Sequence, residues 1–121
     1  MSGALEGIKV LDLTWVLSGP YATMILADLG AEVIKIERPV FGDRARGTAP
    51  FTEGYSSYFM SLNRGKKGIT IDLQNPKGKE LFLRLVDQAD VLVENYRPGT
   101  MESLGLDYPI LQERNPQLIY A

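Results

Sequence analysis

Short apolar segments alternate with segments of helical pattern along this chain, and that alternation restricts its possible folds more than any other feature. Apolar and β-branched side chains predict strands at residues 8–13, 32–37, 69–73, 90–94 and 117–120. Helices are predicted between them at residues 21–29, from residue 75 onward, at 100–104 and at 107–114. This strand–helix–strand order favours an α/β fold built on a mostly parallel sheet.

Two of the predicted helices carry clear start signals. Ser18 or Gly19 is expected to cap the first, with Pro20 in its first turn and Gly30 at its end. Asn75 is expected to cap the second, directly before a proline. The apolar stripe of this second helix consists of Leu81, Phe82, Leu85 and Val86.

The segments between these elements are less regular. Residues 38–54 are predicted as a long polar loop, and loops of that length in compact domains are usually functional or mobile. Residues 55–62 fit either a short helix or an extended segment, and residues 63–68 a turn. The cations Arg64, Lys66 and Lys67 in that turn are interpreted as solvated, at the sheet edge where the strands begin.

The missing residue types exclude several chemistries from this chain. Cysteine and histidine are absent, which excludes disulfides, zinc ribbons, Ser-His-Asp triads and imidazole metal sites. A net charge of −2 argues against a nucleic-acid partner. No signal peptide and no apolar run of membrane-spanning length is recognisable, so we expect no membrane association and a cytoplasmic location.

The last residue, Ala121, directly follows an apolar strand with no polar tail. Chain ends are usually polar and exposed. Residues 1–121 are therefore interpreted as one portion of a larger domain, with the remainder outside this sequence.

Parallel sheets bind ligands outside the carboxyl ends of their strands, which directs attention to four loops. These are residues 14–19, the segment from residue 38, residues 74–75 and residues 95–99. Arg38 and Arg97 suit phosphates, Asn95 offers amide groups and Tyr96 a stacking face. The alternatives are a solvated Arg38, a packing role for Tyr96 and a simple turn at residues 97–99.

The carboxylates in or beside the strands do not pair as a general acid and base, which makes Asp12, Glu37 and Asp72 weak catalytic candidates. Glu37 ends the second strand, where a dinucleotide-binding protein places its ribose-binding acid. The first loop, however, reads Ser18-Gly19-Pro20 and lacks the Gly-x-Gly-x-x-Gly pattern. A nicotinamide-dependent enzyme is therefore the weakest of the readings.

Several motifs in the same order resemble the class III coenzyme A transferases, the family of formyl-CoA transferase, carnitine CoA-transferase and α-methylacyl-CoA racemase. They are LEGIKVLDL at residues 5–13, Gly19-Pro20, DLGAEVIKIERP at 28–39, LNRGKK at 62–67, VENYRPG at 93–99, LGL at 104–106 and Asn115-Pro116. The resemblance covers nearly the whole chain. It implies an α/β, Rossmann-like fold, a mostly parallel sheet with helices on both faces, as the N-terminal part of a large CoA-binding domain.

The same resemblance implies a CoA thioester as substrate, with no permanently bound cofactor, and an interlocked homodimer. Val16 would touch the pantetheine region, Leu17 would face the acyl site and Arg38 would meet the CoA phosphates. The nucleotide wall would consist of Ile71, Asp72, Leu73, Gln74, Asn95, Tyr96, Arg97, Ser103 and Leu104.

Two positions of that wall depart from the family pattern, because Gln74 and Ser103 stand where members often carry Lys and Arg. Arg97 or Lys77 is a possible replacement for the lost charge. Leu17 is apolar where an oxalate- or formyl-specific enzyme carries a polar side chain, which favours a less polar acyl group.

The resemblance also implies a mechanism. An aspartate nucleophile would form anhydride and aspartyl-CoA thioester intermediates, and it is expected beyond residue 121. Transfer of CoA from an acyl-CoA to a free carboxylic acid is therefore the leading hypothesis. The alternatives are a racemase of the same family and a non-catalytic nucleotide-binding fragment.

Overall fold

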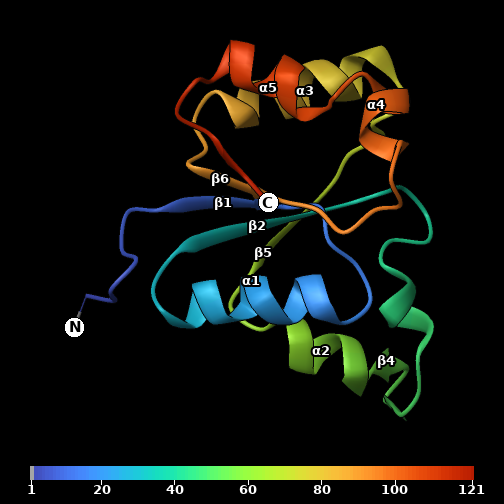
Figure 1. Ribbon diagram of the computed structural model, residues 1–121. Helices are drawn as coiled ribbons and strands as arrows, with labels where there is room; N and C mark the ends of the chain where they lie inside the picture. Colours follow the sequence, from blue (N-terminus) through green and yellow to red (C-terminus); the bar gives the residue numbers. More distant parts are fainter. Residues whose placement is uncertain (1) are drawn as a thin grey trace.

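A computed structural model describes residues 2–121, which form a five-stranded sheet flanked by helices (Figure 1). The strands are β1 (Lys9–Asp12), β2 (Glu32–Glu37), β5 (Lys67–Thr70), β6 (Val91–Val93) and β7 (Ile119–Tyr120). Their spatial order is β5-β2-β1-β6-β7, and every neighbouring pair in this sheet is parallel. Counted along the chain the order is 3-2-1-4-5, that of a doubly wound, Rossmann-like sheet, so the predicted fold class is confirmed.

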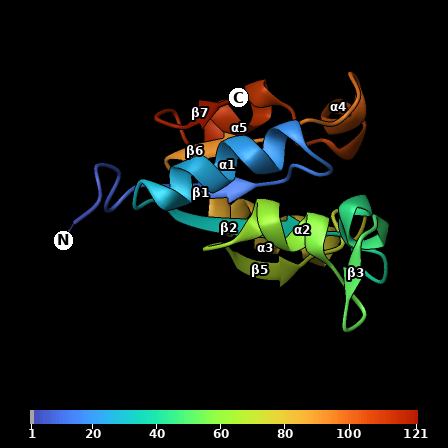
Figure 2. The same ribbon diagram turned by 90° about the horizontal axis from the view of Figure 1, so that it is seen from below.

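The helices cover both faces of this sheet, as expected. Helices α1 (Ser18–Asp28) and α2 (Ser57–Asn63) lie on one face, while α3 (Pro76–Val86), α4 (Thr100–Leu104) and α5 (Tyr108–Arg114) lie on the other (Figures 1 and 2). Within residues 2–121 no helix is long and apolar enough to cross a membrane.

The core is divided by the sheet into a larger and a smaller cluster. Leu11 and Leu13 join the larger one, below α3 and α5, together with the fully buried Phe82. Val10, which alternates with them along β1, joins Val33 and Ala31 in the smaller cluster on the α1 side. Successive residues of β1 therefore pack into apolar clusters on opposite faces of the sheet, as expected for a strand that is buried on both faces.

The capping predictions are confirmed for one helix and wrong in detail for the other. The Asn75 side chain accepts a hydrogen bond from the backbone amide of Lys77, so α3 begins as expected. Helix α1 begins at Ser18 rather than at residue 21, and the residue before it, Leu17, offers no capping side chain. Pro20 lies in the first turn, and Gly30 follows the helix in a left-handed conformation, as predicted.

The third strand of the sheet lies earlier than predicted. It spans Lys67–Thr70 rather than residues 69–73, because β5 pairs with Ile34–Glu37 and the last bond of this ladder joins the Ile71 amide to the Glu37 carbonyl. Residues 71–74 therefore form the loop at the carboxyl end of β5. Ile71 is buried in the larger core cluster, while Asp72 and Gln74 are exposed.

The long segment after β2 contains regular structure that the sequence did not reveal. It includes a 3₁₀ helix, η1 (Arg44–Gly47), and a small hairpin of β3 (Phe51–Thr52) and β4 (Tyr55–Ser56). The ambiguous residues 55–62 divide between β4 and α2, which the Ser56 side chain caps by accepting from the Phe59 amide. The start of η1 lies beside the loop after β1, where the Asp43 side chain accepts from the Val16 amide.

Candidate functional site

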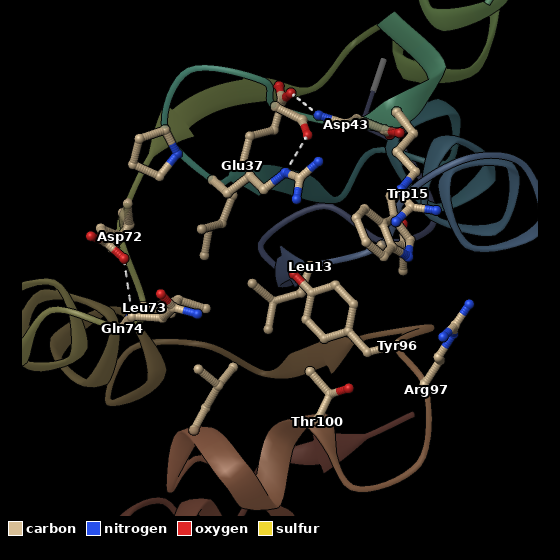
Figure 3. Close-up of a pocket in the computed structure, with 18 of the residues that line it drawn as sticks. Leu13, Trp15, Glu37, Asp43, Asp72, Leu73, Gln74, Tyr96, Arg97 and Thr100 are labelled. Atoms are coloured by element: carbon tan, nitrogen blue, oxygen red, sulfur yellow. Dashed lines mark hydrogen bonds between the residues drawn. The ribbon is translucent and has the colours of Figure 1, made fainter. Parts of the chain in front are cut away.

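A cavity of about 610 Å³ lies at the carboxyl ends of the parallel strands, and we call it the large cavity. In Figure 3 Asp72, Leu73 and Gln74 lie on one side of it and Trp15 and Arg97 on the other. Leu13 and Tyr96 lie between these two walls. Between β1 and β6 the order of the strands reverses, and in doubly wound sheets that point is where ligands bind.

Most of the residues singled out from the sequence meet at this cavity. Nine of them line it: Arg38, Ile71, Asp72, Leu73, Gln74, Tyr96, Arg97, Ser103 and Leu104. Val16, Leu17 and Asn95 do not line the large cavity. They line a second one of about 380 Å³, the small cavity, together with Trp15, Ser18, Arg44 and Arg97.

The two cavities adjoin one another, since Trp15, Arg44 and Arg97 line both. Neither Trp15 nor Arg44 was predicted from the sequence as a site residue. Trp15 lies in a loop that the strand-end rule had already selected, so its position was a usable signal. Arg44 lies within the long polar segment, and only the turn of η1 brings it to the cavities.

Residues 14–16 contribute to the lining of both cavities, and their backbone is held by side chains from four places in the fold. The Asp12 carboxylate accepts from the Thr14 amide at 2.8 Å, and Lys35 donates to the Thr14 carbonyl at 2.8 Å. The Asn95 amide bonds both the N–H and the C=O of Trp15, at 3.0 and 2.9 Å. Asp43 accepts from the Val16 amide at 2.9 Å.

These bonds hold Val16 in a left-handed conformation, with φ of 72°. A β-branched residue rarely adopts that conformation, which costs on the order of 1–3 kcal/mol. Asn95 was proposed from the sequence as a ligand contact. Asn95 lines the small cavity, and its side chain also orients the segment of residues 14–16 through Trp15.

Lys66 corrects one interpretation of the sequence. Its side chain is 2% exposed, and Nζ lies 2.9 Å from Asp12 Oδ2, from the Pro20 carbonyl oxygen and from Asn63 Oδ1. Lys66 is therefore not a solvated turn residue, because its side chain extends to the first turn of α1 and bonds there to the Pro20 carbonyl. Burial lowers the pKa of Lys66, while the Asp12 carboxylate opposes that shift. Arg64 and Lys67 do lie at the surface, as expected.

Glu37 is committed to structure rather than free for a ligand. Its carboxylate receives two bonds from Arg46, at 2.7 and 2.8 Å, and one from the Asp43 amide. Burial alone would raise the pKa of Glu37, but these donors hold it below its usual value. The bonds to Arg46 and Asp43 thus occupy the Glu37 carboxylate. A free carboxylate at this position was the one feature that favoured a nicotinamide-dependent enzyme.

Tyr96 packs and lines the large cavity at the same time. Its ring meets Trp15 edge to face, with centroids 5.5 Å apart. Burial raises the pKa of Tyr96 to about 12, so its hydroxyl remains a protonated donor near neutral pH. The Trp15 indole also has the guanidinium carbons of Arg38 and Arg44 within 5.5 and 4.8 Å of its centroid.

The positive charge of the site comes from arginines without acidic partners. Four of the seven arginines form ion pairs with carboxylates: Arg46, Arg64, Arg84 and Arg114. Among the residues that the structure describes, the three without such a pair are Arg38, Arg44 and Arg97, and all three line the large cavity.

Gln74 and Ser103 are the neutral residues that stand where family members often carry Lys and Arg. Both line the large cavity, as expected. Of the two proposed replacements for the lost charge, Arg97 lines this cavity and Lys77 does not. Over residues 2–121 no group of three or more His, Cys, Asp or Glu side chains is arranged to hold a metal ion.

Comparisons with known proteins agree with this arrangement. The family model described as CoA-transferase family III matches residues 5–121. A succinyl-CoA:mesaconate CoA-transferase of Haloarcula hispanica is 52% identical over 124 residues, covering 98% of this chain and 31% of that protein. The human succinyl-CoA:glutarate CoA-transferase is 50% identical over 118 residues, covering 97% of this chain and 27% of its own length.

Solved structures give the same result. The crystal structure of a CAIB/BAIF family protein from Brucella suis superposes with a TM-score of 0.92 at 45% identity. The match covers 99% of this chain and 33% of that one. The chain thus spans about a third of the length of the relatives that it matches.

Proposed function

The chain belongs to CoA-transferase family III, and from that premise we propose that it forms the CoA-binding part of an enzyme that transfers CoA between an acyl-CoA thioester and a free carboxylic acid. One observation carries the proposal. Two adjoining cavities lie at the switch point of a parallel sheet, and every arginine without an acidic partner among residues 2–121 lines them. An elongated ligand with phosphates suits such a site.

In this proposal the large cavity receives the nucleotide end of CoA. Arg38 supplies a guanidinium group for its phosphates, and no ion pair among the described residues occupies that group. The wall of residues 71–74 offers Asp72, an exposed carboxylate suited to accept bonds from ribose hydroxyls or an adenine amino group. The pantetheine arm then passes Trp15 toward Val16 and Leu17 in the small cavity.

The proposed chemistry begins with an aspartate from outside residues 1–121. Its carboxylate attacks the donor thioester carbon, the C–S bond breaks, and a mixed anhydride and CoA thiolate form. The thiolate attacks the aspartyl carbon of the anhydride, which releases the donor acid and leaves an aspartyl-CoA thioester. The acceptor carboxylate attacks that thioester and frees the thiolate again. The thiolate then attacks the acceptor carbonyl, which yields the new acyl-CoA and restores the aspartate.

The carboxylates that bond to the loops around the large cavity, Asp12, Glu37 and Asp43, support a nucleophile from elsewhere. Asp12 and Asp43 are buried and paired with lysines, and Glu37 is bound by Arg46. A carboxylate that is already bonded by cations and amides is a poor nucleophile. These three groups therefore serve to position the loops and not to form the anhydride. The mechanism asks for no resident cofactor, because the CoA substrate brings its own sulfur.

A homodimer remains part of the proposal. Leu17, Tyr21, Ile25 and Leu29 follow one another at four-residue spacing along α1, and each is more than two-fifths exposed. A helix that is apolar on its outer face as well as its inner one is normally covered. We infer that this face is buried in the complete assembly.

The test is an assay of the full-length protein for CoA exchange between acyl-CoA donors and a panel of free acids. Exchange supports the proposal. Racemisation of a 2-methylacyl-CoA without any exchange would instead identify a racemase of the same family. If the protein binds CoA by calorimetry and shows neither reaction, a non-catalytic nucleotide-binding role replaces the proposal.

A further inference from the structure

The lining of the small cavity has an unusual charge composition. It holds two guanidinium groups, those of Arg44 and Arg97, and no Asp or Glu. Neither arginine forms an ion pair with any carboxylate that the structure describes. The large cavity differs, because Glu37, Asp43 and Asp72 line it beside its arginines. The small cavity thus has no carboxylate in its own lining that could neutralise its two arginines.

The position of Arg44 is set by the fold. Arg44 is the first residue of the 3₁₀ helix η1 and directly follows the buried Asp43. Its guanidinium carbon lies 4.8 Å from the centroid of the Trp15 indole, and Asn95 holds Trp15 by both of its backbone polar groups. A guanidinium that lies over an aromatic ring still has N–H donors for a second partner.

The rest of the lining combines the neutral polar residues Ser18 and Asn95 with Trp15, Val16 and Leu17. Val16 and Leu17 are 42% and 51% exposed, and they supply the branched side chains of this cavity. Leu17 alone favoured a less polar acyl group. Leu17 and the two arginines together favour an acyl group that has methylene groups in its middle and an anion at its free end.

We propose that the small cavity is a subsite for the free carboxylate of a short dicarboxylic acyl group, with Arg44 as its main partner and Arg97 as the second. The inference rests on the proposed function, since it assumes that the acyl end of CoA thioesters lies at Val16 and Leu17. In a thioester the reacting carboxyl carries no charge. Only a second carboxylate gives the bound acyl group an anion for these guanidinium groups.

The test compares two four-carbon donors that differ in that charge, succinyl-CoA and butyryl-CoA, in the full-length protein with one common acceptor. In a ping-pong reaction kcat/KM for the donor covers only the donor half-reaction, so the choice of acceptor cancels. Arg44→Met is expected to lower kcat/KM for succinyl-CoA about 10- to 100-fold and to leave that for butyryl-CoA within about twofold. Arg44→Lys should recover part of the loss, because it restores the charge without the planar fork.

Arg84→Met is the matched control. Arg84 is an exposed arginine on α3 that pairs with Glu80 and lines neither cavity, so both donors should react as in the unchanged protein. An equal loss for the two donors in Arg44→Met would mean that Arg44 holds the CoA phosphates. That result, or a wild-type preference for butyryl-CoA, overturns the inference and leaves the proposed function intact.

A binding measurement separates this inference from the function on which it rests. If no acid accepts CoA, the proposed function fails, and calorimetry with the two thioesters then decides the subsite. Tighter binding of succinyl-CoA than of butyryl-CoA, abolished in Arg44→Met, supports it. Equal binding of both thioesters refutes it.

Discussion

The ammonium group of Lys35 lies 2.9 Å from Oδ2 of Asp43, and the two side chains are only 3% and 1% exposed. Lys35 also donates to the Thr14 carbonyl, while Oδ1 of Asp43 accepts from the amides of Val16 and Ala45. One buried ion pair thus joins the loop after β1 to the start of η1. Both cavities depend on that junction, because Thr14, Val16 and Asp43 belong to their walls.

Asp43→Asn tests how much this ion pair matters for stability. The asparagine keeps an oxygen for the two amides but leaves Lys35 buried without a counter-charge. Breaking one side of a buried pair costs about 3–5 kcal/mol, so we expect the free energy of unfolding to fall by about that amount. Asp28→Asn is the matched control, because Asp28 pairs with Arg64 at the surface, and it should cost less than about 1 kcal/mol. Urea denaturation of the full-length proteins measures both, and similar losses would argue against a buried charge at Lys35.

Asn95→Ala tests whether this residue acts on ligand binding through Trp15. The substitution frees the N–H and the C=O of Trp15, and lost bonds of this kind cost about 1–2 kcal/mol. We expect CoA affinity, measured by calorimetry on the full-length protein, to fall about tenfold as the loop loses its fixed conformation.

Asn115→Ala is the control for that experiment. The Asn115 amide donates to the carbonyls of Val86 and Ala89, and Asn115 lines neither cavity. Its loss should lower stability by a similar amount and leave the CoA affinity unchanged. A parallel fall in affinity for both variants would assign the effect of Asn95 to general destabilisation.

Gly78→Ala tests the wall of residues 71–74. A Cβ at residue 78 would come into direct conflict with the carbonyl oxygen of Asp72, so this turn of α3 or the wall itself must move. Overpacking of that kind costs about 1–3 kcal/mol, and we expect both a lower melting temperature and weaker CoA binding. Gly68→Ala is the comparison, because a Cβ there meets nothing within 4 Å. If Gly78→Ala binds CoA as Gly68→Ala does, residues 71–74 do not form the nucleotide wall.

We expect the free energy of unfolding to depend on pH through the Glu37 carboxylate. The folded state holds the pKa of Glu37 below its ordinary value of 4.5, so the unfolded chain takes up the proton first as the pH falls. The contribution of Glu37 is therefore fully present above pH 4.5 and is lost as the pH falls through the lower, folded pKa. The stability difference between the wild type and Glu37→Gln, measured by denaturation at pH 7 and near pH 4, should shrink in acid. A difference that stays constant would contradict the depressed pKa.

The sequence was sufficient for the order of the strands of the main sheet along the chain and for nine of the residues that line the large cavity. Alternating apolar residues located the strands, and the strand-end rule then selected Arg38, Tyr96 and Arg97, which the fold brings together. The third strand was placed too late because residues 69–73 are apolar enough to extend it. Only its pairing with β2 decides that the ladder ends at Thr70.

The polar framework could not be predicted in the same way. Lys35 and Lys66 are charged residues in ordinary sequence surroundings, and nothing local indicates that each meets a carboxylate in the interior. Their partners, Asp43 and Asp12, lie 8 and 54 residues away along the chain. The same holds for Asn95, whose partner Trp15 is 80 residues distant. Contacts at such separations arise from the tertiary fold and leave no periodic pattern in the sequence.

The bonds around residues 14–16 also affect how such a site can change over time. Asp12, Lys35, Asp43 and Asn95 hold the backbone there, so a change in any one of them disturbs the loop as a whole. The side chains of Val16, Leu17 and Arg44 take no part in that framework. A lineage can therefore exchange these three side chains one at a time and acquire a new acyl preference without rebuilding the scaffold that carries them.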